Sequence, residues 1–154
     1  MNRSQNVARV TRPALIALAA VALLSPRVHP ASAAPADPNS PKGSFSGTYI
    51  SDDQTLSGPI KLSITSVKSA GVPGNLTVKG KLTIGSKVKN KPYTGNYMTA
   101  DRFLSGGTLV PRGYAGSFSG TLSQDGKTFT GEWGYNTVPQ DSDQHQGTAS
   151  MSKR

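Results

Sequence analysis

A short module recurs along this chain and restricts what the chain can fold into. It consists of a large apolar residue, any residue, glycine, any residue and a second large apolar residue. A period of two places its three defined residues on one face of a β-strand. The module occurs six times, as Phe45-Gly47-Tyr49, Leu56-Gly58-Ile60, Val78-Gly80-Leu82, Tyr93-Gly95-Tyr97, Phe118-Gly120-Leu122 and Phe129-Gly131-Trp133.

Glycine in the middle of a strand packs nothing and costs stability, so its repeated use on the inner face needs a reason. We expect curvature, because glycine lets strands bend at the corners of a small barrel. A second expected consequence is room, since glycine between aromatic residues can leave a central cavity.

A hairpin design is used twice. Residues 116–133 place two alternating runs around Asp125-Gly126, which is a strong β-hairpin signal. The opening of this segment, Gly-Ser-Phe-Ser-Gly-Thr, also occurs at residues 43–48. We expect strands near residues 44–50, 55–66, 75–84, 86–90, 92–98, 107–111, 114–123, 127–135 and 146–152. Turn signals separate them at Asp52-Asp53, Gly71-Val72-Pro73-Gly74, Asn90-Lys91-Pro92, Ser105-Gly106-Gly107, Pro111-Arg112-Gly113 and Asp125-Gly126. The sequence therefore predicts an all-β fold, a single small antiparallel up-and-down β-barrel of about eight strands.

The N-terminus predicts export. Residues 1–33 combine three early arginines, the apolar run Pro13 to Leu24 and the small-x-small pattern Ala31-Ser32-Ala33, as in a bacterial signal peptide. The apolar run is short for a transmembrane helix, so we expect no transmembrane segment in the mature chain, with an N-terminal membrane anchor as the alternative. Residues 34–42 carry three prolines and read as a linker, and residues 43–154 as the barrel domain.

Composition limits the class of protein. The 154 residues suffice for one domain, and the formal charge is +9, of which +5 remains after cleavage. The chain has no cysteine, which excludes disulfides, thiol enzymes and cysteine-ligated metals. The protein is expected to be basic and either secreted or periplasmic.

The C-terminal pattern resembles calycin-type barrels, the group that includes lipocalins and avidins. It comprises the Gly-x-Phe-x-Gly-Thr strand at residues 116–121, the Asp-Gly turn, Gly131-x-Trp133 and a last Gly-Thr-Ala strand at residues 147–149. The resemblance implies a small secreted barrel. Lipocalins carry their Gly-x-Trp on the first strand and avidins use several tryptophans, whereas this chain has a single tryptophan late in the sequence.

Residues suited to acid–base chemistry are few. His145 is the single histidine of the mature chain, and no nucleophile elbow, P-loop or dinucleotide fingerprint occurs. We expect a non-enzymatic protein without a cofactor. Asp141, Asp143 and His145 alternate, so in an extended segment they would share one face and suit a cation; the alternative is a solvated loop.

Five lysines share odd numbers while nearby apolar residues share even ones. In a hairpin this would place Lys79, Lys81, Lys87, Lys89 and Lys91 in one outer stripe. Such a stripe attracts anionic polymers or lipid surfaces, or simply keeps an edge soluble. It lacks interleaved aromatics, so we expect no specific nucleic acid binding.

Five aromatic residues are candidates for a ligand pocket. They are Tyr49, Tyr93, Tyr97, Tyr114 and Trp133, which alternatively form plain core. The leading functional hypothesis is a binding protein that holds a small apolar ligand inside the barrel. The alternative is a cell-envelope protein whose lysine face binds an anionic polymer or partner. A barrel cyclase or isomerase is the third.

The first prediction concerns processing. Mature protein should begin at Ala34, or at Pro35 if cleavage falls one residue later, because signal peptidase accepts small residues at these positions. N-terminal sequencing of exported material checks this. Retention of Met1 would contradict it and would favour the membrane anchor.

Overall fold

The structure is a computed structural model that describes residues 40–139 and 143–154. These residues belong to one compact unit, Pro35–Arg154. The expected signal peptide and nearly all of the expected linker lie outside the described residues. Their predicted roles therefore stay predictions.

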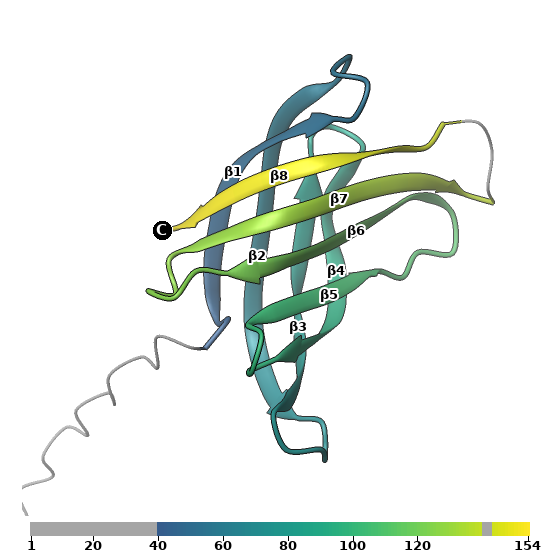
Figure 1. Cartoon of the computed structure of the whole chain (residues 1–154). Helices are drawn as coiled ribbons and strands as arrows, with labels where there is room; N and C mark the ends of the chain where they lie inside the picture. The colour runs from purple at the N-terminus through teal and green to yellow at the C-terminus, as the bar shows by residue number, and fades with distance from the viewer. Residues whose placement is uncertain (1–39, 140–142) are drawn as a thin grey trace, which may run out of the picture. The chain divides into compact units, whose positions relative to one another are not determined.

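Eight antiparallel strands form a closed barrel in which each strand pairs with its neighbours in sequence and β8 pairs with β1. Figure 1 shows the strands following one another around the barrel. Their bounds are β1 Gly43–Ser51, β2 Ser57–Ser69, β3 Asn75–Ile84, β4 Val88–Met98, β5 Phe103–Thr108, β6 Gly113–Leu122, β7 Thr128–Val138 and β8 His145–Lys153. The prediction of an all-β up-and-down barrel is confirmed.

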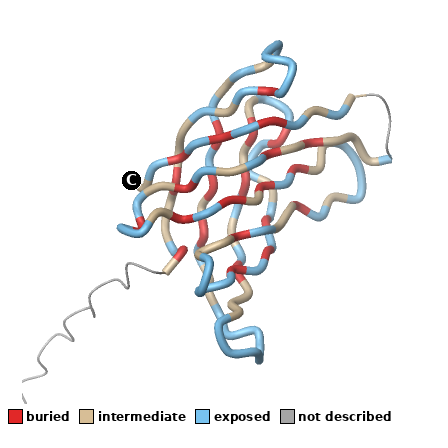
Figure 2. The backbone as a smooth tube through the Cα atoms, in the orientation of Figure 1, coloured by how far each residue is buried: buried red, intermediate tan, exposed pale blue. Residues whose placement is uncertain are grey.

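Alternating side chains fill the barrel. Along β6, Phe118 and Leu122 are buried while Ser117 and Thr121 are exposed, and Figure 2 shows the same alternation around the barrel. The core contains three phenylalanines whose rings meet edge to face, with Phe45 and Phe118 each against Phe129 at centroid distances of 4.7 and 6.0 Å. All three are fully buried. Burial of this apolar surface is the main stabilising contribution.

The inward glycines bring backbones together. A Cβ atom at Gly47 would overlap the carbonyl oxygen of Ser150 on β8, and one at Gly131 would overlap the backbone of Ser119 and Gly120 on β6. Neighbouring backbone occupies the place of the missing side chain. The expected curvature therefore has a physical basis, whereas the expected extra room does not follow from these glycines.

Two turn predictions were wrong. Pro92 lies inside β4 opposite Lys81, so residues 88–90 and 92–98, which were expected in two strands, belong to one. The irregularity in β4 lies just before Pro92. Asn90 has a φ of 51°, and the pairing register between β3 and β4 shifts there. Gly106 and Gly107 form part of β5 rather than a turn. A Cβ atom at Gly106 would crowd Gly95 Cα at 2.5 Å, so close strand contact explains this glycine.

The other turn signals hold. Gly126 has a φ of 70° in the turn between β6 and β7, where Ser123 N donates to Thr128 O at 2.8 Å. Glycine reaches this left-handed conformation at little cost. Within the described part of the chain, no helix is long and apolar enough to cross a membrane.

The second prediction compares two glycines of β7. Gly131→Ala should destabilise the protein by about 1–3 kcal/mol, because its Cβ meets the β6 backbone, which cannot rotate away. Gly134→Ala is the control, since its Cβ would lie 3.3 Å from the rotatable Ser117 hydroxyl. Thermal and urea unfolding measure both. Equal stabilities of the two variants would contradict the role assigned to Gly131.

Candidate functional site

Three of the five candidate pocket aromatics, Tyr93, Tyr97 and Trp133, belong to the packed core. Tyr93 and Tyr97 are fully or almost fully buried among apolar side chains. The Tyr93 hydroxyl donates to the carbonyl oxygen of Phe118 at 3.0 Å, and burial raises the pKa of this phenol. The Tyr93 hydroxyl already donates its proton to a backbone carbonyl, so it cannot donate to a ligand. We therefore assign Tyr93 a structural role.

Trp133 and the other two candidates, Tyr49 and Tyr114, lie at one end of the barrel, which we call the aromatic end. It comprises Tyr49, Tyr114, Trp133, Tyr135 and His145. The Tyr49 and Trp133 rings lie 4.3 Å apart, and Tyr135 contacts Trp133, Tyr114 and His145 at centroid distances of 5.8, 5.5 and 5.4 Å. Tyr135 was not predicted from the sequence as a candidate residue. Its place two residues after Trp133 on the inner face was the available signal.

These rings pack against one another and against the chain. Trp133 Nε1 donates to the carbonyl oxygen of Ile50 at 3.1 Å. The Tyr49 ring lies against Gly58, where a Cβ atom would be 3.0 Å from its hydroxyl. The aromatics at this end of the barrel therefore pack against one another.

A charged clasp crosses the aromatic end. Asp143 accepts hydrogen bonds from the Tyr114 hydroxyl at 2.5 Å and from Lys87 Nζ at 3.1 Å, and Lys87 also donates to Tyr114 at 2.9 Å. These bonds lower the pKa of Asp143, with the Tyr114 bond as the main cause, and raise the pKa of Lys87. The clasp joins the β3–β4 turn, β6 and the segment before β8.

The expected cation ligands are only partly placed. Asp141 lies outside the described residues, while Asp143 Oδ1 is 3.6 Å from His145 Nε2. The Lys87 ammonium forms an ion pair with the other carboxylate oxygen, Asp143 Oδ2. Among residues 40–139 and 143–154, no three His, Asp or Glu side chains cluster as metal ligands would.

The expected lysine stripe is divided. Lys79 and Lys81 are exposed on β3 and Lys89 on β4, but Lys91 is half-buried opposite Leu82, and Lys87 belongs to the clasp. Two lysines of β2 that the sequence analysis did not include join the exposed set. We call the outer face of β2–β4, with Lys61, Lys68, Lys79, Lys81 and Lys89, the lysine wall.

The lysine wall has no acidic counterpart. No aspartate or glutamate occurs between Asp53 and Asp101, a stretch that holds seven lysines. Both ion pairs formed among the described residues involve Asp143 rather than a wall lysine. Lys61 and Lys81 flank a hollow of about 400 Å³ with Ser63, Thr83 and Asn90. The wall is therefore a surface of unpaired positive charge.

The remaining outer surface has a different chemistry. We call the outer face of β5–β8 and β1 the hydroxyl wall. Its outward positions are mostly serine and threonine: Ser44, Ser46, Thr48, Ser105, Ser117, Ser119, Thr121, Thr128, Thr130, Thr148, Ser150 and Ser152. Glu132 is the only carboxylate in these five fully described strands.

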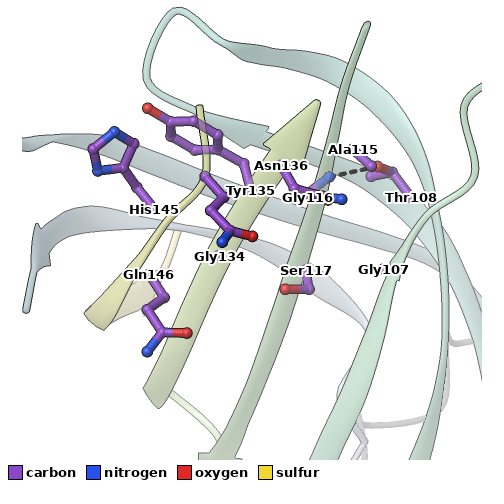
Figure 3. Close-up of a pocket in the computed structure, with 11 residues that line it drawn as sticks. Gly107, Thr108, Ala115, Gly116, Ser117, Gly134, Tyr135, Asn136, His145 and Gln146 are labelled. Carbon is purple, nitrogen blue, oxygen red and sulfur yellow. Dashed lines mark hydrogen bonds between the residues drawn. The ribbon is translucent and has the colours of Figure 1, made fainter. Parts of the chain in front are cut away.

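The hydroxyl wall is hollowed. A depression of about 590 Å³ lies over β5–β8, and Figure 3 shows its lining residues, among them Ser117, Gly134 and Gln146. Two of the lining residues are hydrogen-bonded to each other: Gly116 N donates to the Thr108 hydroxyl at 2.8 Å, drawn as a dashed line in Figure 3. The alternation of serine and threonine with apolar residues along these strands was a signal in the sequence for this wall. It was not used, because the predicted pocket residues were taken from the inward positions.

No family model, curated protein or solved structure matches the chain. The function must therefore be argued from the geometry and charge of the barrel.

The third prediction concerns the clasp. Lys87→Gln should lower the melting temperature at pH 7, and Lys89→Gln, an exposed neighbour, should not. Because the pKa of Asp143 is lowered by folding, this carboxylate contributes to the stability of the folded state at pH values above the ordinary carboxyl pKa of 3.8. That contribution is lost as the pH falls from 3.8 through the lowered pKa of the folded state. The difference between Lys87→Gln and wild type should therefore narrow below about pH 4. A difference independent of pH would contradict the clasp.

Proposed function

We propose that this chain is an exported, non-enzymatic barrel that binds an anionic polymer of the cell envelope on its lysine wall. The supporting observation is the segregation of charge. Five lysines project outward from β2–β4, with no carboxylate in these strands. Export is supported by the signal-peptide pattern of residues 1–33.

Like charges on neighbouring strands repel one another, so the free barrel carries an electrostatic cost at this wall. Lys79 and Lys81 alternate on β3, and Lys61 and Lys81 line the same hollow. A polyanion would relieve that repulsion and release its own condensed counterions. The extent of the wall over three strands suits a linear polymer better than a single small anion.

The binding is expected to read charge rather than sequence or shape. The outward positions between the wall lysines carry serine and threonine, and they offer no aromatic platform for bases. Lysine acts as a flexible point charge rather than as a planar fork. These features favour an anionic envelope polymer over a specific nucleic acid.

The interior gives less support to the apolar-ligand hypothesis. Tyr93, Tyr97 and the three core phenylalanines are buried in the core cluster, and the inward glycines Gly47, Gly80, Gly95 and Gly131 face neighbouring backbone. A calycin-type relationship belongs to this proposal as well. The closed meander of eight strands is compatible with it, whereas ligand binding inside the barrel does not follow from that topology.

The fourth prediction tests the wall with long-chain polyphosphate as the probe. Wild type should bind with an affinity that falls as salt rises. Changing Lys61, Lys79 and Lys81 together to glutamine should weaken binding and make the slope of log K against log salt shallower by about 2. This assumes about 0.7 for each charge neutralised, as for single-stranded polyanions.

A matched control removes the same charge elsewhere. Lys42, Arg112 and Lys127 lie outside the lysine wall, and their replacement by glutamine should change the slope far less. Equal losses in the two triple variants would show that net charge alone governs binding. That result, or no binding by wild type at low salt, would overturn the proposed function.

A further inference from the structure

Three hollows on the hydroxyl wall run into one another. The first, over β5–β8, shares Ser117, Gly134 and Gln146 with the second, which holds about 240 Å³. The second shares Glu132 and Thr148 with the third, which holds about 770 Å³ and reaches Thr48 on β1. Together they form one oblique groove, which we call the wall groove.

The wall groove crosses five strands, from Gly107 on β5 to Thr48 on β1. Four interstrand spacings give it a length of about 19 Å. Its floor is low where Gly134 presents no side chain to the outside. The barrel pairs every one of these strands on both sides, so the groove is rigid before any ligand arrives.

Hydroxyl and amide groups line much of the groove, together with two carboxylates, Asp52 and Glu132. Thr130, Thr148 and Ser150 expose hydroxyls that each donate and accept, and none is engaged by another described side chain. Gln146 adds a planar amide, held by a bond from its Nε2 to Asp52 Oδ2 at 3.2 Å. Ile50, which is 43% exposed, offers an apolar contact at the β1 end.

This chemistry disfavours several classes of partner. An anion would meet Glu132 and Asp52 with no lysine or arginine among the lining residues. An apolar molecule would leave the hydroxyls without water or partner. Protein interfaces are enriched in methionine and arginine and depleted in serine, whereas this lining has several serines and no methionine or arginine.

A neutral sugar chain has the matching chemistry. Its hydroxyls both donate and accept, its C–H faces suit Ile50, and its length suits a groove that spans five strands. We propose that the wall groove binds a neutral polysaccharide chain. This second site is independent of the lysine wall on the opposite strands.

The test uses immobilised dextran, mannan and galactomannan as probes. We expect wild type to bind at least one of them, and to keep that binding at about 0.5 M salt, where charge interactions are screened beyond about 4 Å. Thr130→Val combined with Thr148→Val keeps side-chain shape and removes two groove hydroxyls. It should weaken binding about tenfold.

The matched control is Thr77→Val combined with Thr94→Val, on the outer face of β3 and β4. It should bind as wild type does, as should the Lys61, Lys79 and Lys81 glutamine variant. Binding to none of the three polysaccharides, or equal weakening by both threonine pairs, would overturn the proposal. Light scattering provides a further check. If wild type is a dimer and only the Thr130→Val and Thr148→Val variant is a monomer, the wall groove binds a second copy of the chain, and the polysaccharide proposal is overturned.

Discussion

The barrel depends on how closely neighbouring backbones approach at its inward glycines. At Gly47 and Gly131, and again at Gly147 against Ile50, a Cβ atom would overlap the backbone of the adjacent strand. Strands that approach this closely curve tightly, so eight of them close into a barrel with a narrow interior. Three phenylalanines, two tyrosines and branched aliphatic residues then fill that interior.

The buried core residues form one cluster of apolar side chains inside the barrel. The aromatic end is held together by ring contacts around Tyr135 and by the clasp of Lys87, Tyr114 and Asp143. No described buried side-chain nitrogen or oxygen lacks a hydrogen-bond partner, so the core presents no polar group that awaits a ligand. Both proposed binding surfaces therefore use outward positions, which folding leaves free to vary.

Those outward positions divide by strand. On β2–β4 they carry lysine, and on β5–β8 and β1 they carry serine and threonine. The lysine wall and the hydroxyl wall belong to one continuous hydrogen-bonded sheet. Along each strand, successive side chains point alternately into the core and to the outside, so the outer residues differ from the core residues. A barrel of this kind can meet a charged polymer and a neutral one on different sides, with salt affecting only the first.

The sequence by itself determined the strand pattern, the inward face and the class of fold, because alternation with glycine at fixed spacing leaves few alternatives. It misplaced Pro92 and Gly106, since local turn chemistry was outweighed by pairing with Lys81 and by contact with Gly95. Only the tertiary structure decided which lysines share a wall. A register shift moved Lys91 out of the stripe, and pairing between strands distant in sequence brought Lys61 beside Lys81 and joined the hydroxyls of β1 to those of β8.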